Sequence, residues 1–183
     1  TGADAALNDA RHFWQETLGA IQVKTPDKSF DIMMNGWLLY QSLACRMWAR
    51  SGFYQASGAY GFRDQLQDSL SFLLTRPGIA REQILRAASR QFTEGDFQHW
   101  WLPATGAGVR TRISDDNVWL AYCASHYVKV VGDDAILDEV IPFIEGQQLS
   151  PGAHDAFFLP QLSEESGSLF EHCARALDRS LAK

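Results

Sequence analysis

An acidic pair preceded by two arginines is the segment of this sequence with the clearest chemistry. Asp115 and Asp116 stand where a non-periodic stretch turns into a helical pattern, just after Arg110 and Arg112. A helix N-cap explains one of the two carboxylates. A carboxylic acid held in a pocket can protonate a glycosidic oxygen, and arginines can bind an attacking phosphate. We therefore treat the pair as catalytic candidates and the two arginines as phosphate-binding candidates.

A second polar group stands at another junction between loop and helix. Arg63 and Asp64 begin a helical segment, and Asp68 lies four residues after Asp64, on the same helix face. One interpretation is an N-cap carboxylate followed by a solvated one. The other is a cluster whose carboxylates and guanidinium bind sugar hydroxyls, and the sequence leaves both open.

A third group lies in a stretch without helical period. His99 is followed directly by Trp100 and Trp101. Two adjacent tryptophans in such a stretch do not both face one core, so one is expected at a surface or pocket, where it can stack on a sugar. For each tryptophan a core position remains the alternative, and for His99 a structural hydrogen bond. We predict all three as substrate-binding candidates.

Helices must position these groups, because apolar residues recur at spacings of three and four along most of the chain. Two long loops, at about 52–61 and 93–114, precede helices. We find no alternating segment that predicts a strand, and a helix ends or kinks at Pro142. The prediction is an all-α chain, with a toroid, solenoid or bundle left open. Seven helices are expected. The first ends at Gly19, and the other six span about 29–50, 62–75, 79–92, 115–131, 133–145 and 163–181.

Composition narrows the class of function. The formal net charge of −6 argues against nucleic-acid binding, and no apolar run is long enough to span a membrane. Six tryptophans suit a sugar ligand. Cys45, Cys123 and Cys173 are odd in number and widely spaced, which indicates buried free thiols in a reducing compartment and no zinc or other metal site. We expect a cytoplasmic location, with anchoring of a parent protein in the inner membrane left open.

Three motifs together carry a family resemblance. They are GFRDQLQD at 61–68, EGDFQHWW at 94–101 and TGAGVRTRISDDNVWL at 105–120. The chain resembles the glycoside hydrolase family 94 phosphorylases, which include cellobiose and chitobiose phosphorylases. Within that group it looks most similar to the phosphorylase-like domain at the C-terminal end of cyclic β-1,2-glucan synthases. KTPDKSFDIMMNGWLLYQ and SLFEHCARALDR extend the resemblance over about residues 24–179.

The resemblance implies an (α/α)6 barrel of about twelve helices. We therefore expect residues 1–183 to be one partial catalytic domain of a larger enzyme, inactive in isolation. A partial barrel exposes an apolar face, so dimerisation is expected as well. The family often has an aromatic residue shortly before the acidic pair, where this chain has Ile113 and Ser114, and the glycosidic linkage stays open.

The resemblance also implies roles for individual residues. Arg63, Asp64 and nearby Asp68 are similar to the group that holds the non-reducing glucose. Arg112, and then Arg110, is similar to the arginine near the phosphate. The acidic pair contains the general acid, with Asp115 preferred because it lies nearer the loop.

The implied reaction is inverting phosphorolysis of a β-linked gluco-oligosaccharide to α-glucose 1-phosphate. Phosphate is already a nucleophile, so one acid and a cationic phosphate site are enough. Inorganic phosphate is then a co-substrate, and no metal or organic cofactor is required. Two alternatives remain: an inverting β-glucan hydrolase with Asp64 or Asp68 as its base, and a non-catalytic sugar-binding fragment.

Overall fold

The fold combines helices with two antiparallel sheets. The computed structural model describes residues 2–48 and 58–182. A four-stranded sheet has the order β1-β2-β3-β5, and β4 pairs with β6 in a second sheet. The prediction of an all-α barrel fragment is therefore wrong, and the chain is mixed α and β. The predicted helix end near residue 50 and most of the predicted loop at 52–61 lie outside the described residues.

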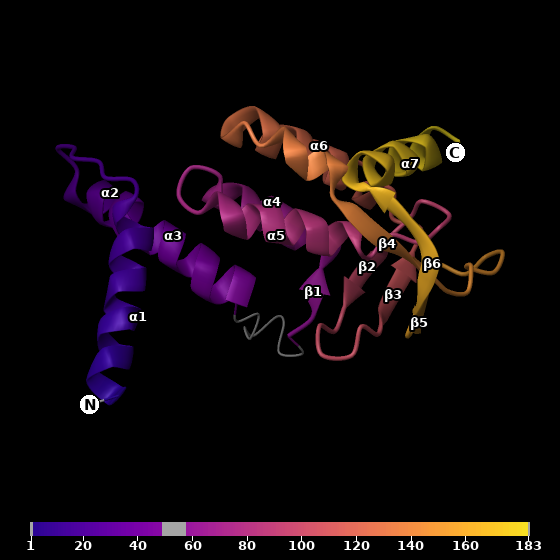
Figure 1. The fold of residues 1–183 in the computed structure, drawn as a ribbon, viewed down its shortest axis with the longest axis horizontal. Helices are drawn as coiled ribbons and strands as arrows, with labels where there is room; N and C mark the ends of the chain where they lie inside the picture. The colour runs from indigo at the N-terminus through magenta and orange to yellow at the C-terminus, as the bar shows by residue number, and fades with distance from the viewer. Residues whose placement is uncertain (1, 49–57, 183) are drawn as a thin grey trace.

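The helices fall into two groups along the chain. The N-terminal helices lie at one end of the molecule and the sheets at the other, with α4, α5 and α6 running side by side between them (Figure 1). From Lys28 to Trp48 the chain stays helical, with α-helical and π-helical turns alternating. The helices are α1 (Gly2–Gly19), α2 (Lys28–Ile32), η1 (Met33–Trp37), α3 (Leu38–Gln41), η2 (Ser42–Trp48), α4 (Phe62–Ser69), η3 (Leu70–Phe72), α5 (Pro77–Ala88), α6 (Asp116–Val131), η4 (Asp134–Asp138) and α7 (Leu169–Leu181).

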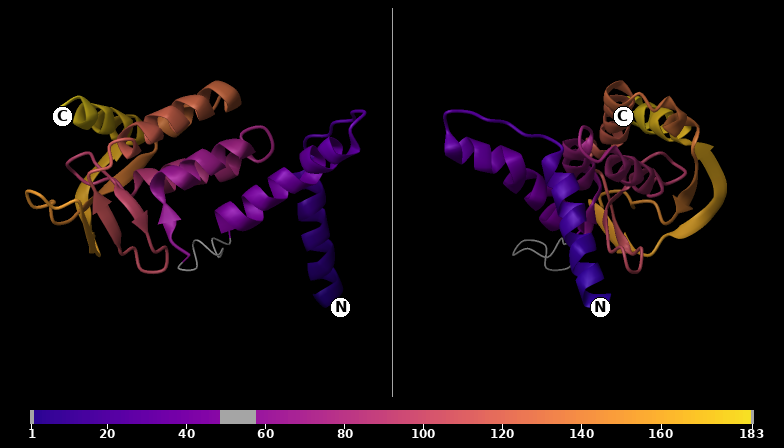
Figure 2. Two further views of the ribbon diagram at one scale, coloured as in Figure 1. Left: turned by 180° about the vertical axis from the view of Figure 1, so that it is seen from behind. Right: turned by 60° about the vertical axis from the view of Figure 1, so that its left-hand side comes forward.

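The strands lie together at the end of the molecule that also holds the C-terminus. Seen from behind and from the side, β4 and β6 curve around the first sheet below α7 (Figure 2). The strands are β1 (Tyr60–Gly61), β2 (Gln98–Trp101), β3 (Gly108–Thr111), β4 (Val140–Glu145), β5 (Asp155–Phe158) and β6 (Gln161–Ser168).

Strand β4 replaces the second half of a predicted helix. Val140, Ile141 and Ile144 are β-branched, which favours a strand. Pro142 has no N–H to donate, and a register irregularity falls between Pro142 and Ile144. Proline is tolerated at such an irregularity but costs a helix about 3 kcal/mol. Pro142 therefore marks a strand here, and the helix ends earlier, in η4.

Strand β6 replaces the start of the last predicted helix. Its residues are mostly exposed and polar, including Glu164 and Glu165. The helix begins only after Ser168, whose hydroxyl accepts from the Glu171 N–H while the Glu171 carboxylate accepts from the Ser168 N–H. This reciprocal cap is a recognised start signal of helices. It places the start of α7 six residues after the predicted start.

The β2–β3 hairpin fills the predicted long loop. Gly108 lies so close to Trp100 that a Cβ there would collide with the Trp100 carbonyl oxygen. Only glycine permits this approach of the two strands. This segment lacks a helical period because it forms a hairpin. One strand of the hairpin carries His99 and the other carries Arg110.

The main core lies among α4, α5, α6 and α7. Phe62, Leu66, Ile84 and Leu120 are fully buried there. A smaller cluster around Leu43 joins the N-terminal helices to η3. Helix α6 has nearly the predicted bounds, and the predicted end of α1 at Gly19 is confirmed.

The three cysteines are free thiols, but only two of them are buried. Cys123 and Cys173 lie in the main core, where burial raises the pKa of each thiol to about 12. Cys45 is exposed, so its predicted burial is wrong.

Large apolar side chains also remain at the surface. On α7, Phe170, Leu177 and Leu181 are exposed along one face, and Trp37 and Ile32 are exposed near the N-terminus. The expectation of a dimer depends on such exposed apolar side chains. The oligomeric state itself stays a prediction.

Candidate active site

The link between β3 and α6 presents the acidic pair. Asp115 occupies the N-cap position of α6, but its side chain caps no backbone N–H. Its Oδ2 instead accepts from Arg63 Nη1 at 2.8 Å, and the Asp115 side chain is 41% exposed. Arg63 stands at the start of α4 and lies over the Trp119 ring, 5.7 Å from its centroid. The helix-capping explanation of Asp115 is thus replaced by an accessible ion pair.

Asp116 has a different environment from its neighbour. Its side chain is 3% exposed, and its Oδ2 lies 2.8 Å from Nδ1 of His99 in a hydrogen bond. Its Oδ1 is buried without a hydrogen-bond partner in the described part of the chain. Burial raises the pKa of Asp116, and the hydrogen bond with His99 only partly opposes this.

His99 lies among three carboxylates. The hydrogen bond with Asp116 raises the pKa of His99, and the charges of Asp64 and Asp115 act in the same direction against the effect of burial. We call Arg63, Asp64, His99, Asp115 and Asp116 the carboxylate cluster. It contains three acidic groups, one permanent cation and one histidine, so with its carboxylates ionised its net charge is negative in either form of His99. Such a cluster suits a neutral, hydroxyl-rich ligand better than an anion.

Asp68 is separated from this cluster by its own ion pair. Asp68 lies one helical turn after Asp64, and its Oδ2 accepts a hydrogen bond from Arg46 Nε of η2 at 2.8 Å. The structure therefore gives Asp68 a contact that joins the N-terminal helices to α4. A sugar contact by Asp68 stays a prediction that this contact does not support.

The two tryptophans of β2 point to opposite faces, as adjacent strand residues do. Trp101 is 1% exposed and packs in the main core against Tyr60. Trp100 is half-buried and lies beside the exposed ring of Phe157, with ring centroids 5.7 Å apart. Of the two, only Trp100 offers a ring face near solvent for a sugar. Phe157 was not among the sequence-predicted residues, since its strand was not recognised.

Arg110 is a buried arginine whose donors are all occupied. Its Nε and Nη2 bind both carboxylate oxygens of Asp96 at 2.8 and 2.6 Å, and Nη2 also donates to Glu94. Its Nη1 donates to the carbonyls of Gly146 and Gln147. Its guanidinium lies 3.9 Å from the centroid of the Phe92 ring. A phosphate contact by Arg110 would require one of these bonds to open.

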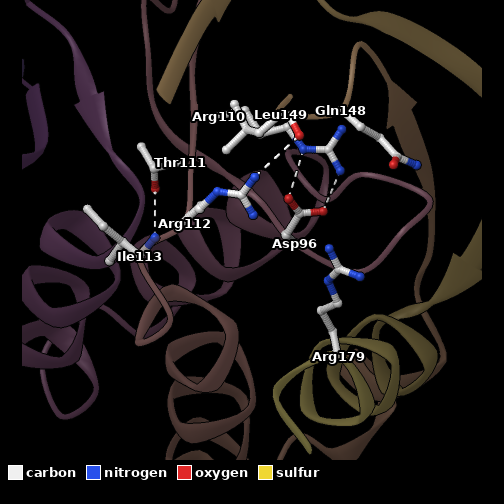
Figure 3. A pocket seen from close by; sticks show the side chains of 8 residues that line it. All are labelled: Asp96, Arg110, Thr111, Arg112, Ile113, Gln148, Leu149 and Arg179. Atoms are coloured by element: carbon white, nitrogen blue, oxygen red, sulfur yellow. Dashed lines mark hydrogen bonds and ion pairs between the residues drawn. The ribbon is translucent and has the colours of Figure 1, made fainter. Parts of the chain in front are cut away.

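Arg112 lines a cavity of about 140 Å³ between β3, the β4–β5 loop and α7 (Figure 3). Its Nε donates to the Ala153 carbonyl, and its Nη2 donates to the carbonyls of Leu149 and Ser150. We call this cavity the arginine pocket. It is lined by Asp96, Arg110, Thr111, Arg112, Ile113, Gln148, Leu149 and Arg179.

Besides Phe157, Trp119 and Arg179 are neighbours of the site that were not among the residues predicted from the sequence. Trp119 lies one helical turn after Asp115 and Asp116, so helical spacing was a usable signal. Arg179 reaches the arginine pocket from α7, 67 residues after Arg112 in the chain. No local pattern connects two residues so far apart.

The chain matches a known enzyme family over most of its length. Residues 13–183 match the family described as "Glycosyl hydrolase 94 superfamily, catalytic domain". This chain belongs to glycosyl hydrolase family 94. The resemblance inferred from the motifs is therefore confirmed.

Three curated relatives give the family its context. The cyclic beta-(1,2)-glucan synthase NdvB of Rhizobium meliloti (strain 1021) is 59% identical over 97% of this chain and 6% of its own length. The solabiose phosphorylase of Paenibacillus borealis is 34% identical over 83% of this chain and 18% of its own. The N,N'-diacetylchitobiose phosphorylase of Vibrio furnissii is 29% identical over 78% and 21%. The chain thus spans at most about a fifth of the length of these relatives.

The described residues contain neither a metal-binding group of side chains nor a membrane-spanning helix. In residues 2–48 and 58–182, no three His, Cys, Asp or Glu side chains are grouped so that they could hold a metal ion. No helix in the same residues combines the length and apolar character needed to cross a membrane.

Proposed function

We propose that this chain contributes the acid-bearing part of an inverting phosphorylase active site. The substrate is a β-linked gluco-oligosaccharide, inorganic phosphate is the nucleophile, and the product is α-glucose 1-phosphate. Membership of family 94 and the names of two phosphorylase relatives support the reaction class. The name of the 59% identical relative supports a β-1,2-glucan as the substrate of the larger protein.

The carboxylate cluster is the observation that carries this proposal. A general acid must touch the leaving oxygen, so geometry is considered before pKa. Asp115 meets this condition, because its carboxylate lies at the surface. Asp116 does not meet it, because its Oδ2 is hydrogen-bonded to His99 and its Oδ1 is buried. Asp115 is therefore our general acid.

Arg63 and the buried pair have supporting roles. Arg63 binds Asp115 in this structure and is free to bind sugar hydroxyls once Asp115 takes up its proton. Asp116 and His99 hold each other from α6 and β2, and so fix the start of α6 that carries Asp115. Trp100, beside Phe157, supplies an aromatic face for a sugar ring.

The reaction follows from these groups. The protonated Asp115 carboxyl gives its proton to the glycosidic oxygen as the C–O bond breaks, and phosphate attacks the anomeric carbon from the opposite face. Phosphate is itself nucleophilic, so no base carboxylate, metal ion or organic cofactor is needed. We also propose a cytoplasmic location, since the free cysteines suit a reducing compartment.

Product analysis of the protein that contains this chain tests the proposal. Incubation with a β-1,2-glucan and inorganic phosphate should release α-glucose 1-phosphate, and leaving out phosphate should stop cleavage. Release of glucose at the same rate without phosphate would indicate a hydrolase instead. Glucan binding without cleavage under both conditions would indicate a non-catalytic sugar-binding module.

A further inference from the structure

Arg63 stands at an unfavourable place for a cation. It lies in the first turn of α4, which begins at Phe62, and no side chain of the Gly61 N-cap binds the backbone N–H groups there. The N-terminus of a helix carries a partial positive charge, which suits an acid such as Asp64 and repels an arginine. The position of the Arg63 guanidinium therefore depends on groups from other elements.

Helix α6 supplies two such groups, and it packs beside α4 (Figure 1). Asp115 Oδ2 accepts from Arg63 Nη1 at 2.8 Å, and the guanidinium lies over the Trp119 ring, 5.7 Å from the ring centroid. Asp115 and Trp119 are four residues apart, so they share one face of the helix. One guanidinium is thus held by a charge and by an aromatic ring that lie one helical turn apart.

The two contacts respond differently when Asp115 takes up a proton. In the proposed reaction Asp115 carries a proton before it gives that proton to the glycosidic oxygen. A neutral carboxyl group no longer attracts the Arg63 cation by its charge. The attraction between a cation and the face of an aromatic ring needs no ionised partner, so the contact with Trp119 persists. Of the two contacts, only Trp119 holds Arg63 in both protonation states of Asp115.

Trp119 is itself held in place by its surroundings. Its side chain is half-buried and packs against the main core, and Tyr122 meets it edge to face with ring centroids 5.5 Å apart. The Arg63 side chain, by contrast, is 48% exposed. A long, exposed side chain loses much rotamer freedom when it binds a ligand. A fixed ring that orders Arg63 beforehand reduces this cost of binding.

We propose that Trp119 is a positioning residue, which keeps the Arg63 guanidinium at the sugar site when the ion pair with Asp115 opens. This inference rests on the proposed function, because that function gives Arg63 the sugar hydroxyls as its ligand. Trp119 acts on the sugar only through Arg63. Its loss should therefore weaken glucan binding only in a protein that still has Arg63. A tryptophan that merely packs α6 against the core would have the same effect with or without Arg63.

A double-mutant cycle in the protein that contains this chain tests the role of Trp119. Wild type, Trp119→Leu, Arg63→Gln and the double variant are titrated with a β-1,2-glucan oligosaccharide by isothermal titration calorimetry. Trp119→Leu should weaken binding about two- to five-fold, as expected for the loss of a cation–π contact at an exposed site. In the Arg63→Gln background the same substitution should have no effect, since the cycle isolates the coupling between the two side chains.

Three further variants make the test specific to the ring. Trp119→Phe keeps an aromatic face and should retain most of the affinity. Fluorinated tryptophan at residue 119 keeps the shape but weakens the negative ring face, so affinity should fall as fluorine atoms are added. Tyr122→Leu is the matched control, because it removes a ring from α6 that has no cation–π contact or hydrogen bond with Arg63 among the described residues. In kinetics, Trp119→Leu should raise the KM for glucan with little change in kcat.

The outcomes separate the role of Trp119 from the reaction itself. Weaker binding in Trp119→Leu that disappears in the Arg63→Gln background supports the proposal. An equal loss in both backgrounds, or full affinity in Trp119→Leu, overturns it even if phosphorolysis continues. Coupling between the two residues in a protein that cleaves glucan without phosphate supports the proposal and overturns phosphorolysis. If circular dichroism shows that Trp119→Leu is unfolded, the fluorinated series decides, and an affinity that does not change with fluorination overturns the proposal.

Discussion

The carboxylate cluster and the arginine pocket lie on the two ends of one short segment and have opposite charge. Residues 110–112 supply two arginines to the pocket, and residues 115–116 supply two carboxylates to the cluster. In the cluster, acids outnumber permanent cations; in the pocket, cations outnumber acids. An anionic nucleophile needs an environment of its own, because carboxylates repel phosphate. Asp115 is paired with Arg63 in this structure, and it takes up a proton when that pair opens. The segment is therefore suited to hold an acid and an anion close together without mixing their surroundings.

The largest effect is expected at the accessible member of the acidic pair. Asp115→Asn should lower phosphorolysis of a natural β-glucan by about 10²–10⁴-fold, since general acid catalysis contributes that much. Steady-state kinetics of the full-length protein measures this. Asp116→Asn is the matched control, and a larger loss there than in Asp115→Asn would reverse our assignment of the acid.

A stability effect is expected at the pocket's buried arginine. Arg110→Met leaves Asp96 and Glu94 without their cation, and both keep some contact with water. We expect a loss of about 3 kcal/mol in the free energy of unfolding, the low end for a broken buried ion pair. Denaturant unfolding measures it. Arg179→Met should cost less than about 0.5 kcal/mol as a surface change, and equal losses would contradict the distinction between the two arginines.

The hydrogen bond between His99 and Asp116 should also affect the titration midpoint of His99. The hydrogen bond with Asp116 raises the pKa of His99, so Asp116→Asn should lower the midpoint of that titration. NMR of the imidazole signals measures the midpoint, with His12 on α1 as the internal reference. An unchanged His99 midpoint would mean that His99 and Asp116 form no hydrogen bond in solution.

The same shift has a consequence for stability against pH. The pKa of His99 is raised in the folded state, so its contribution is fully present below the unfolded value of about 6.5. It is lost as pH rises through the higher folded-state value. Wild type should therefore lose more stability than His99→Gln across this interval in thermal unfolding, and parallel curves would argue against the pair.

The smallest expected effect concerns the aromatic face. Trp100→Ala should weaken glucan binding by about two- to ten-fold, in line with about 0.5–1.5 kcal/mol for an aromatic contact. Isothermal titration calorimetry with a β-glucan oligosaccharide measures it, and Trp100→Phe should keep most of the affinity. An Ala variant with full affinity would remove Trp100 from the sugar site.

Sequence reasoning was most successful where local signals agree. Helix α6 starts beside an acidic pair and ends before Gly132, whose positive φ suits a C-terminal stop, and its predicted bounds were nearly right. Residues 140–145 show the opposite case. Their apolar spacing predicts a helix, whereas their β-branched residues and Pro142 favour a strand. The partner strand that stabilises them lies some twenty residues later.

The site was predictable only in part, for a related reason. Motif resemblance indicated Arg63 and Asp115, which are 52 residues apart in sequence yet form one ion pair. The difference in burial between Asp115 and Asp116 depends on how β2 brings His99 to the start of α6, and sequence spacing does not encode this. The position of Arg179 likewise depends on how α7 packs against α5, α6 and β6, which brings this side chain to the pocket that β3 lines.

Kinetics with two leaving groups and varied phosphate test the separation of acid and anion most directly. The full-length wild type, Asp115→Asn and Arg112→Gln are compared on natural β-glucan and on a β-glucoside with an activated leaving group. Our account predicts that Asp115→Asn recovers on the activated substrate with an unchanged KM for phosphate. Arg112→Gln, at the predicted phosphate-binding arginine, should instead show a raised KM for phosphate on both substrates. If both variants alter the same kinetic parameter, or if Asp115→Asn stays equally slow on the activated substrate, the account is contradicted.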